Sequence, residues 1–124
     1  MRALLVDDSK AIRMMLRRAL TQCGFDDFAE AGDGYEALTV LANGPQPDAA
    51  FVDWNMPKLL GIDLVRAIRK NHTFDEMAIL MVTSETAFER LEEALQAGAD
   101  EYVMKPFTVE VLEEKLALVR MARS

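Results

Sequence analysis

Five short apolar runs alternate along the chain with longer segments in which apolar residues recur every three or four positions. Short apolar runs bounded by turn-forming residues predict strands buried on both faces, and the longer segments predict amphipathic helices. The expected strands cover residues 2–7, 28–31, 49–52, 78–82 and 101–104. The expected helices follow them, with their apolar positions within residues 12–23, 37–41, 64–68, 86–97 and 109–121. The pattern therefore predicts five strand–helix units.

The strict alternation of strand and helix predicts an α/β fold in which a five-stranded parallel sheet carries helices on both faces. Right-handed crossovers in a chain of this length favour the strand order 2-1-3-4-5 of the flavodoxin-like doubly wound fold. Local signals agree, because Asp33 and either Asp8 or Ser9 are suited to cap helix N-termini. Pro57 bars helical geometry at the residue before it, so a loop must follow the third strand.

The composition narrows the class of protein. With 124 residues, of which 51% are hydrophobic and 28% charged, the chain is expected to form one globular domain. Its net charge of −7 disfavours nucleic acid and anionic membranes as partners, and no apolar run approaches the ~20 residues of a membrane span. The single Cys23 excludes an intrachain disulfide, so we expect a cytoplasmic protein. Arg13, Arg17 and Arg18 cluster on one predicted helix, where we interpret them as a solvated face.

Four of the predicted strands end in charged or hydroxyl-bearing residues. These residues are Asp7 and Asp8, Asp53, Thr83, and Lys105. In a parallel sheet all strands finish at the same edge, so the fold itself would gather these side chains at one site. Each residue alone has an ordinary structural explanation as a helix cap, a turn residue or a solvated lysine. The coincidence of four such strand ends on one edge favours a functional site.

The charges in this set indicate a particular chemistry. Three carboxylates packed together raise at least one pKa unless a cation lies among them, and oxygen ligands without His or Cys select a hard divalent ion such as Mg2+. Mg2+ and Lys105 together would place positive charge opposite Asp53, which suits a phosphoryl group in transfer. Asp53 can then act as a nucleophile and form an aspartyl phosphate, while Thr83 and Lys105 bond to phosphoryl oxygens.

These residues, in this order, resemble the signature of the receiver domains of two-component response regulators. The resemblance covers the whole chain, and within the family the chain is most similar to single-domain chemotaxis regulators. The matching residues are Asp7-Asp8, Asp53-Trp54-Asn55-Met56-Pro57, Thr83 and Lys105-Pro106. We therefore expect residues 1–124 to form a stand-alone receiver domain with no output domain. The alternatives within the family are a phosphate sink, a phosphorelay intermediate and the receiver part of a larger regulator.

The resemblance implies a role for each matching residue. Asp53 would be the phosphoacceptor, and a sensor histidine kinase would supply the phosphoryl group in a Mg2+-dependent reaction. Thr83 and Lys105 would sense the phosphoryl group. The domain would be a signalling protein and not an enzyme, because it would catalyse only its own phosphorylation and dephosphorylation. The Mg2+ ligands would be Asp7, Asp8, Asp53 and the backbone carbonyl of Asn55.

Further residues would transmit phosphorylation and set its lifetime. Tyr102 matches the aromatic switch position, which swings inward when Thr83 moves, and the peptide bond between Lys105 and Pro106 would be cis. Asn55 and Glu85 occupy positions that tune how quickly water removes the phosphoryl group. The resemblance therefore implies a phosphorylated form that lasts seconds to minutes rather than hours.

The resemblance also implies a partner-binding face formed by the helix at 86–97, the fifth strand and the last helix. A downstream target would bind there, with the flagellar motor switch as the candidate in chemotaxis, and a phosphatase would be a further partner. The chain itself is expected to be a monomer. The helix at 86–97 carries three glutamates and a single basic residue, Arg90, whereas the chemotaxis regulators have lysines near its start. This difference leaves the identity of the target open.

Two other classes of protein fit part of the pattern. Residues 31–37 match a loose G-x-G-x-x-A motif after a strand, as in dinucleotide-binding domains, but that interpretation leaves the other strand-end residues without a role. A phosphohydrolase that works through an aspartyl phosphate usually has a second carboxylate two residues after the nucleophile. The residue there is Asn55, which cannot donate a proton in that way. The receiver interpretation explains more of the sequence.

Overall fold

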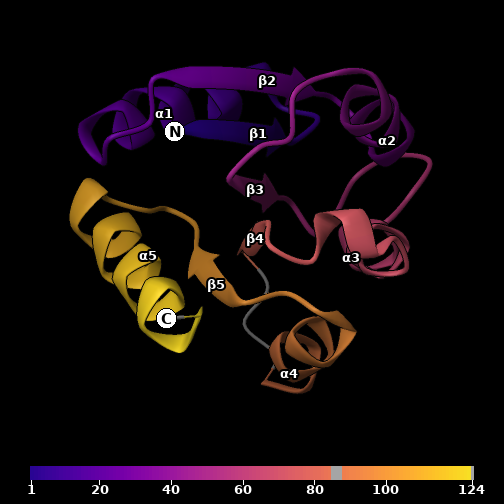
Figure 1. Ribbon diagram of the computed structural model, residues 1–124. Coiled ribbons are helices and arrows are strands. Elements are labelled where there is room, and N and C mark those ends of the chain that lie inside the picture. The colour runs from indigo at the N-terminus through magenta and orange to yellow at the C-terminus, as the bar shows by residue number, and fades with distance from the viewer. Residues whose placement is uncertain (85–87, 124) are drawn as a thin grey trace.

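The computed structural model describes residues 1–84 and 88–123 and has a five-stranded parallel sheet with the order β2-β1-β3-β4-β5 (Figure 1). Both the fold class and the strand order predicted from the sequence are confirmed. The strands are β1 (Arg2–Val6), β2 (Asp27–Ala31), β3 (Ala49–Val52), β4 (Ala78–Thr83) and β5 (Glu101–Met104). The helices are α1 (Lys10–Gln22), α2 (Gly34–Asn43), α3 (Gly61–Arg69), α4 (Phe88–Ala97) and α5 (Val109–Arg123). A 3-10 helix, η1 (His72–Phe74), lies between α3 and β4. Within the two described ranges, no helix has the length and hydropathy to cross a membrane.

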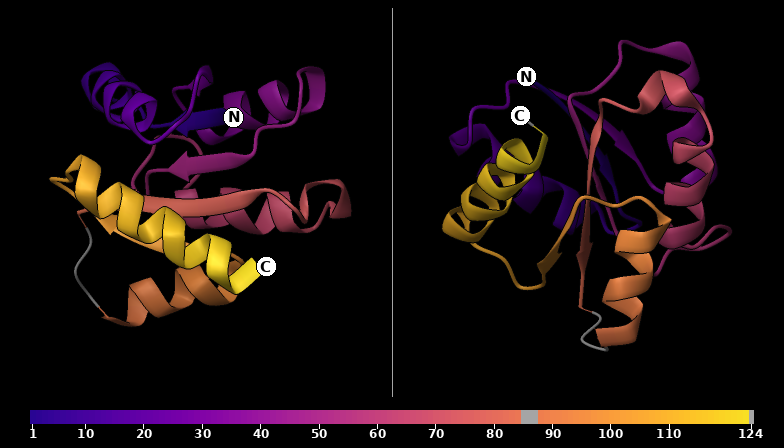
Figure 2. Two further views of the ribbon diagram at one scale, coloured as in Figure 1. Left: turned by 60° about the vertical axis from the view of Figure 1, so that its left-hand side comes forward. Right: turned by 60° about the horizontal axis from the view of Figure 1, so that its bottom comes forward.

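The sheet lies between two layers of helices, with α1 and α5 on one face and α2, α3 and α4 on the other (Figures 1 and 2). Strand β1 shows how the sequence builds this arrangement. Ala3 and Leu5 point into the core beneath α1 and α5, while Leu4 and Val6 point into the opposite core. All four are fully buried, as expected for a parallel strand covered on both faces.

The loops after β1 and β2 are fixed by helix caps. The side chain of Ser9 accepts a hydrogen bond from the N–H of Ile12 (3.2 Å) and caps α1. Asp33 accepts one from the N–H of Glu36 (2.9 Å) and caps α2. Because Ser9 and not Asp8 caps α1, the carboxylate of Asp8 lies instead with the acidic residues at the sheet edge.

The arginines of α1 form the solvated face that we expected from the sequence only in part. Arg13 and Arg17 both pair with Glu30 on the edge strand β2, at N–O distances of 2.9 and 3.0 Å. Arg17 also stacks over the ring of Phe28, with its guanidinium carbon 4.8 Å from the ring centroid. Arg17 and Arg18 are nevertheless exposed, as predicted. The interpretation was wrong for Arg13, whose guanidinium is largely buried against the carboxylate of Glu30 on the neighbouring strand.

At the amino end of the sheet, Asp100 ties together three elements. Its carboxylate accepts hydrogen bonds from the backbone N–H of Ile79 in β4 (2.8 Å) and from Arg69 in α3 (3.0 Å). Arg123, the last residue of α5, pairs with the same carboxylate at 3.0 Å. Because two guanidinium groups and a buried N–H share one acceptor, loss of Asp100 would leave all three without it.

Replacing Asp100 by alanine is therefore expected to lower the free energy of unfolding by about 2 kcal/mol. The change would remove the carboxylate that pairs with the positive charge of Arg69, and this arginine is partly buried. The matched control is Asp63→Ala, which removes a pair with Arg66 whose two side chains are about half exposed. That change is expected to cost at most about 0.5 kcal/mol. Urea unfolding followed by circular dichroism measures both variants, and equal losses would contradict the structural role of Asp100.

Candidate functional site

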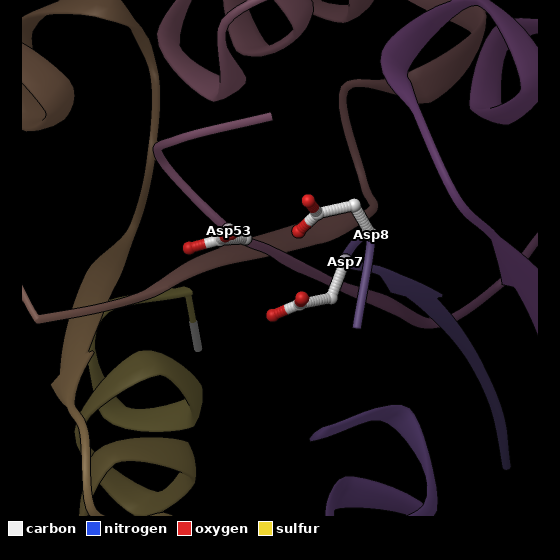
Figure 3. Close-up of side chains that lie close together, drawn as sticks. All are labelled: Asp7, Asp8 and Asp53. Carbon is white, nitrogen blue, oxygen red and sulfur yellow. The ribbon is translucent and has the colours of Figure 1, made fainter. Parts of the chain in front are cut away.

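Three carboxylates meet at the carboxyl edge of the sheet. Asp7 and Asp8 follow β1, and Asp53 follows the neighbouring strand β3. Their side chains gather around one point (Figure 3), with one oxygen of each within 4.8 Å of the others. Asp7 and Asp53 are buried and Asp8 is exposed. The acidic residues that the sequence predicted at this edge are thus brought together.

Lys105 completes this cluster from the end of β5. Its ammonium lies 2.9 Å from Oδ2 of Asp7 and 3.2 Å from Oδ1 of Asp53. Its backbone N–H donates to the carbonyl of Thr83 (2.9 Å), which fixes it to the end of β4. The peptide bond between Lys105 and Pro106 is cis, as the resemblance implied. One cation therefore serves two buried carboxylates.

The electrostatics of the cluster are unbalanced toward negative charge. Burial raises the pKa of Asp53 above its usual value, and the charge of Asp7 adds to the rise, while Lys105 opposes it. For Lys105, burial alone would lower the pKa, but hydrogen bonding to Asp7 and the charge of Asp53 outweigh it and the pKa is raised. Lys105 is thus held as a cation that only partly compensates the acidic groups.

The donor set fits a hard divalent cation. All three carboxylates offer oxygen, and no Cys or His belongs to the cluster, a set of ligands that suits Mg2+ better than Zn2+. A divalent charge would also offset the excess negative charge that raises the pKa of Asp53. Asn55, the fourth ligand implied by the resemblance, is exposed and lies in the loop two residues beyond Asp53.

Replacing Asp53 by asparagine is expected to stabilise the chain against unfolding at pH 7 in a chelating buffer. The folded-state pKa of Asp53 is raised, so protonation favours the fold and the charged form at neutral pH opposes it. The advantage of the asparagine should therefore shrink as the pH falls toward the ordinary range of an Asp, near 4. Urea unfolding in EDTA across this range tests the sign, and a variant less stable than the parent at pH 7 would contradict it.

The loop between β3 and α3 is packed directly against Asp53. The N–H of Gly61 donates to the carbonyl of Trp54 (2.9 Å). A Cβ at Gly61 would lie 2.0 Å from the carbonyl oxygen of Asp53, so no larger residue fits without a shift of the backbone. Lys58 adopts a left-handed φ of 71°, which is unusual for a residue other than glycine. The sequence indicated a loop here but not how closely it approaches the site.

The residues expected to transmit phosphorylation lie on the neighbouring strands. Thr83 is fully buried at the end of β4. Tyr102 is half-buried in β5, and the ammonium of Lys115 in α5 lies 4.4 Å from the centroid of its ring. Glu85 and the first two residues of the helix expected at 86–97 lie outside the described residues. The structure thus positions Thr83 and Tyr102 on the adjacent strands β4 and β5, and β5 lies between α4 and α5 (Figure 1).

Sequence reasoning missed two arginines that contact the site. Arg13 in α1 donates to the backbone carbonyl of Asp7 (2.5 Å), and Arg90 in α4 lies over Trp54, with its guanidinium carbon 5.9 Å from the ring centroid. A signal for Arg13 was available, because side chains in a helix lean toward its N-terminus, where Asp7 and Asp8 lie. Arg90 had no such signal, since its position over Trp54 depends on the packing of two separate elements.

Comparison with known proteins agrees with the geometry. The response regulator receiver domain family matches residues 3–117. The chain is 44% identical over 116 residues to the chemotaxis protein CheY of Pseudomonas aeruginosa, which covers 94% of this chain and 93% of that protein. It is 40% identical over 119 residues to the chemotaxis protein CheY1 of Helicobacter pylori, with 96% of each covered.

A solved structure shows the same fold. The chemotaxis response regulator CheY4 of Vibrio cholerae superposes with a TM-score of 0.85 at 36% identity, covering 95% of this chain and 97% of that one. The dinucleotide-binding and phosphohydrolase interpretations are therefore set aside. The chain belongs to the response regulator receiver domain family and is related over most of its length to chemotaxis response regulators.

Proposed function

We propose that this signalling domain is a phosphorylation-activated switch in chemotaxis, which accepts a phosphoryl group on Asp53 from a sensor histidine kinase. The observation that carries the proposal is the cluster of three carboxylates within 4.8 Å, two of them bridged by the ammonium of Lys105. Such a cluster combines a nucleophile, a site for a divalent cation and a fixed positive charge. Residues 1–124 form a receiver domain in this proposal, and the chain acts as a monomer.

The chemistry follows from the groups present. An oxygen of Asp53 attacks phosphorus, the P–N bond to the donor imidazole breaks, and its electron pair stays on the imidazole nitrogen. No carboxylate follows Asp53 at the position of Asn55, so this loop supplies no acid to protonate a poor leaving group. The proposed donors are therefore phosphohistidine and small acyl phosphates, whose leaving groups depart readily, and not ordinary phosphomonoesters.

The remaining site residues stabilise the charge of the transferring group. Lys105 already contacts Asp53, so its ammonium is in place to pair with a phosphoryl oxygen, and the Thr83 hydroxyl is proposed to bond to another. Mg2+ bound at this site would neutralise charge on the carboxylates and on the phosphoryl oxygens. Its proposed ligands are Asp7, Asp8, Asp53 and the backbone carbonyl of Asn55.

The output follows from the position of the switch residues. Thr83 and Tyr102 lie on the paired strands β4 and β5, and β5 lies between α4 and α5 (Figure 1). A phosphoryl group that engages Thr83 can therefore shift a pre-existing equilibrium of this face. We propose that a downstream target, with the flagellar motor switch as the candidate, binds α4, β5 and α5. Asn55 and Glu85 tune hydrolysis in this proposal, and a phosphatase acts on the phosphorylated form.

The fluorescence of Trp54 tests the proposal, because this buried residue directly follows Asp53. Titration with Mg2+ is expected to change the emission, and beryllofluoride added in the presence of Mg2+ is expected to cause a second change. Asp53→Ala is the control and should lose the second response. Absence of both responses in the parent chain would refute the phosphoacceptor function.

A further inference from the structure

We propose that Arg13 is a positioning residue for the metal site, a role that rests on the divalent-cation binding proposed above. Its guanidinium holds the backbone at the end of β1, so that Asp7 and Asp8 keep the orientation in which they bind the cation. Neither the sequence pattern nor the role of the acidic residues assigns this task to Arg13.

The contacts of Arg13 support this role. One nitrogen, Nη1, donates to the carbonyl of Asp7 at 2.5 Å, while Nε donates to Glu30 at 2.9 Å. The side chain is only 17% exposed, so water competes poorly for these bonds. The guanidinium thus joins α1, β2 and the peptide unit between the two acidic residues, because the Asp7 carbonyl belongs to the bond that leads into Asp8.

Glu30 anchors the guanidinium at its other end. Burial opposes ionisation of Glu30, but hydrogen bonds from Arg13 and Arg17 outweigh it and hold the pKa of Glu30 below its usual value. Glu30 therefore stays charged and keeps Arg13 in one orientation. The planar guanidinium of an arginine has N–H donors in fixed directions and can bond Asp7 and Glu30 at the same time. The ammonium of a lysine is a point charge and is less suited to hold both groups.

The carboxylate of Asp7 is also held by hydrogen bonds, one to each of its oxygens. Its Oδ1 accepts from the backbone N–H of Ser9 (2.9 Å) and its Oδ2 from Lys105 (2.9 Å). Among these contacts, the hydrogen bond from Arg13 to the carbonyl of Asp7 sets the direction in which the chain continues into Asp8. Such outer contacts to ligand-bearing groups typically change metal affinity by about 10- to 100-fold when they are removed.

Positioning and simple electrostatics predict opposite signs. Arg13 is a cation close to a cation-binding site, so charge alone predicts that its removal strengthens Mg2+ binding. Positioning predicts the reverse, because a misdirected Asp8 must be reoriented before it can bind. The sign of the change in the dissociation constant therefore separates the two effects.

The test compares Mg2+ binding by the parent chain, Arg13→Gln, Arg13→Lys and Arg17→Gln, by calorimetry and by Trp54 fluorescence. We expect Arg13→Gln to weaken binding about 10-fold and Arg13→Lys to weaken it comparably, although lysine keeps the charge. Arg17→Gln removes a cation from the same Glu30 but not the contact to Asp7, so its dissociation constant should stay close to that of the parent. Phosphorylation from acetyl phosphate should need more Mg2+ in both Arg13 variants but reach the parent rate at saturation.

Each remaining outcome overturns the proposal. Tighter or unchanged binding by Arg13→Gln would show that Arg13 acts only through its charge or not at all, and parent-like binding by Arg13→Lys would show the same. A phosphorylation rate that stays low at saturating Mg2+ would indicate general structural damage, for which urea unfolding provides a separate measure. If the parent chain itself binds no Mg2+, the proposed function fails first, and this result is distinguishable from equal binding by parent and variants.

Discussion

Replacement of Asp53 by asparagine is expected to abolish phosphoryl acceptance while leaving the fold intact. The amide has no nucleophilic oxygen anion, and it is close to the carboxylate in size, so the packing around this buried position is kept. Asp7 is a poor substitute nucleophile, because its two oxygens are engaged by Lys105 and by the N–H of Ser9. Transfer of radiolabel from acetyl phosphate, or from a phosphorylated histidine kinase, should fall below detection.

The control for this experiment is Asp63→Asn, which makes the same chemical change on the exposed side of α3. It should accept label at the parent rate. Label that persists in Asp53→Asn would move the acceptor to Asp7 or Asp8 and contradict the assignment of roles within the cluster. Loss of label together with greater stability in EDTA would show that the variant is folded and lacks only the chemistry.

The sheet and its order could be predicted because the signals that specify them are local. The run at 49–52 is apolar at every position and all four residues are buried. This continuous apolar pattern is typical of a parallel strand that is covered by helices on both faces. The parallel arrangement alone then predicts that Asp7, Asp8 and Asp53 meet at one edge of the sheet. Strand boundaries differed by a residue or so, since pairing and not propensity decides where a strand ends.

Contacts between distant side chains could not be predicted in this way. Nothing in the sequence indicates that Glu30 on β2 forms ion pairs with both Arg13 and Arg17, because these pairs depend on how α1 packs across the edge of the sheet. The left-handed φ of Lys58 was equally hidden, since lysine carries no preference for it. Tertiary packing decides these features.

Gly61→Ala is expected to be strongly destabilising, because α3 begins in contact with the backbone of Asp53, the proposed phosphoacceptor. Helix propensity alone favours alanine over glycine by about 1 kcal/mol at a helical position. Against this, the added Cβ would lie 2.0 Å from the carbonyl oxygen of Asp53, a backbone atom that cannot rotate away. Either α3 or the end of β3 must move, and we expect a net loss of about 3 kcal/mol in the free energy of unfolding.

The same displacement should impair the site. The N–H of Gly61 bonds to the carbonyl of Trp54, so a shift of α3 moves the backbone that directly follows Asp53 and should weaken Mg2+ binding as well. Gly32→Ala is the matched control, since it lies near the same sheet edge and a Cβ there would meet its nearest atoms at 3.8 Å, an ordinary contact. Its stability should change by less than about 0.5 kcal/mol. Urea midpoints and Mg2+ titrations of both variants test this prediction. If Gly61→Ala matches the parent in both measurements, close packing of α3 against Asp53 is not what holds this carboxylate in place.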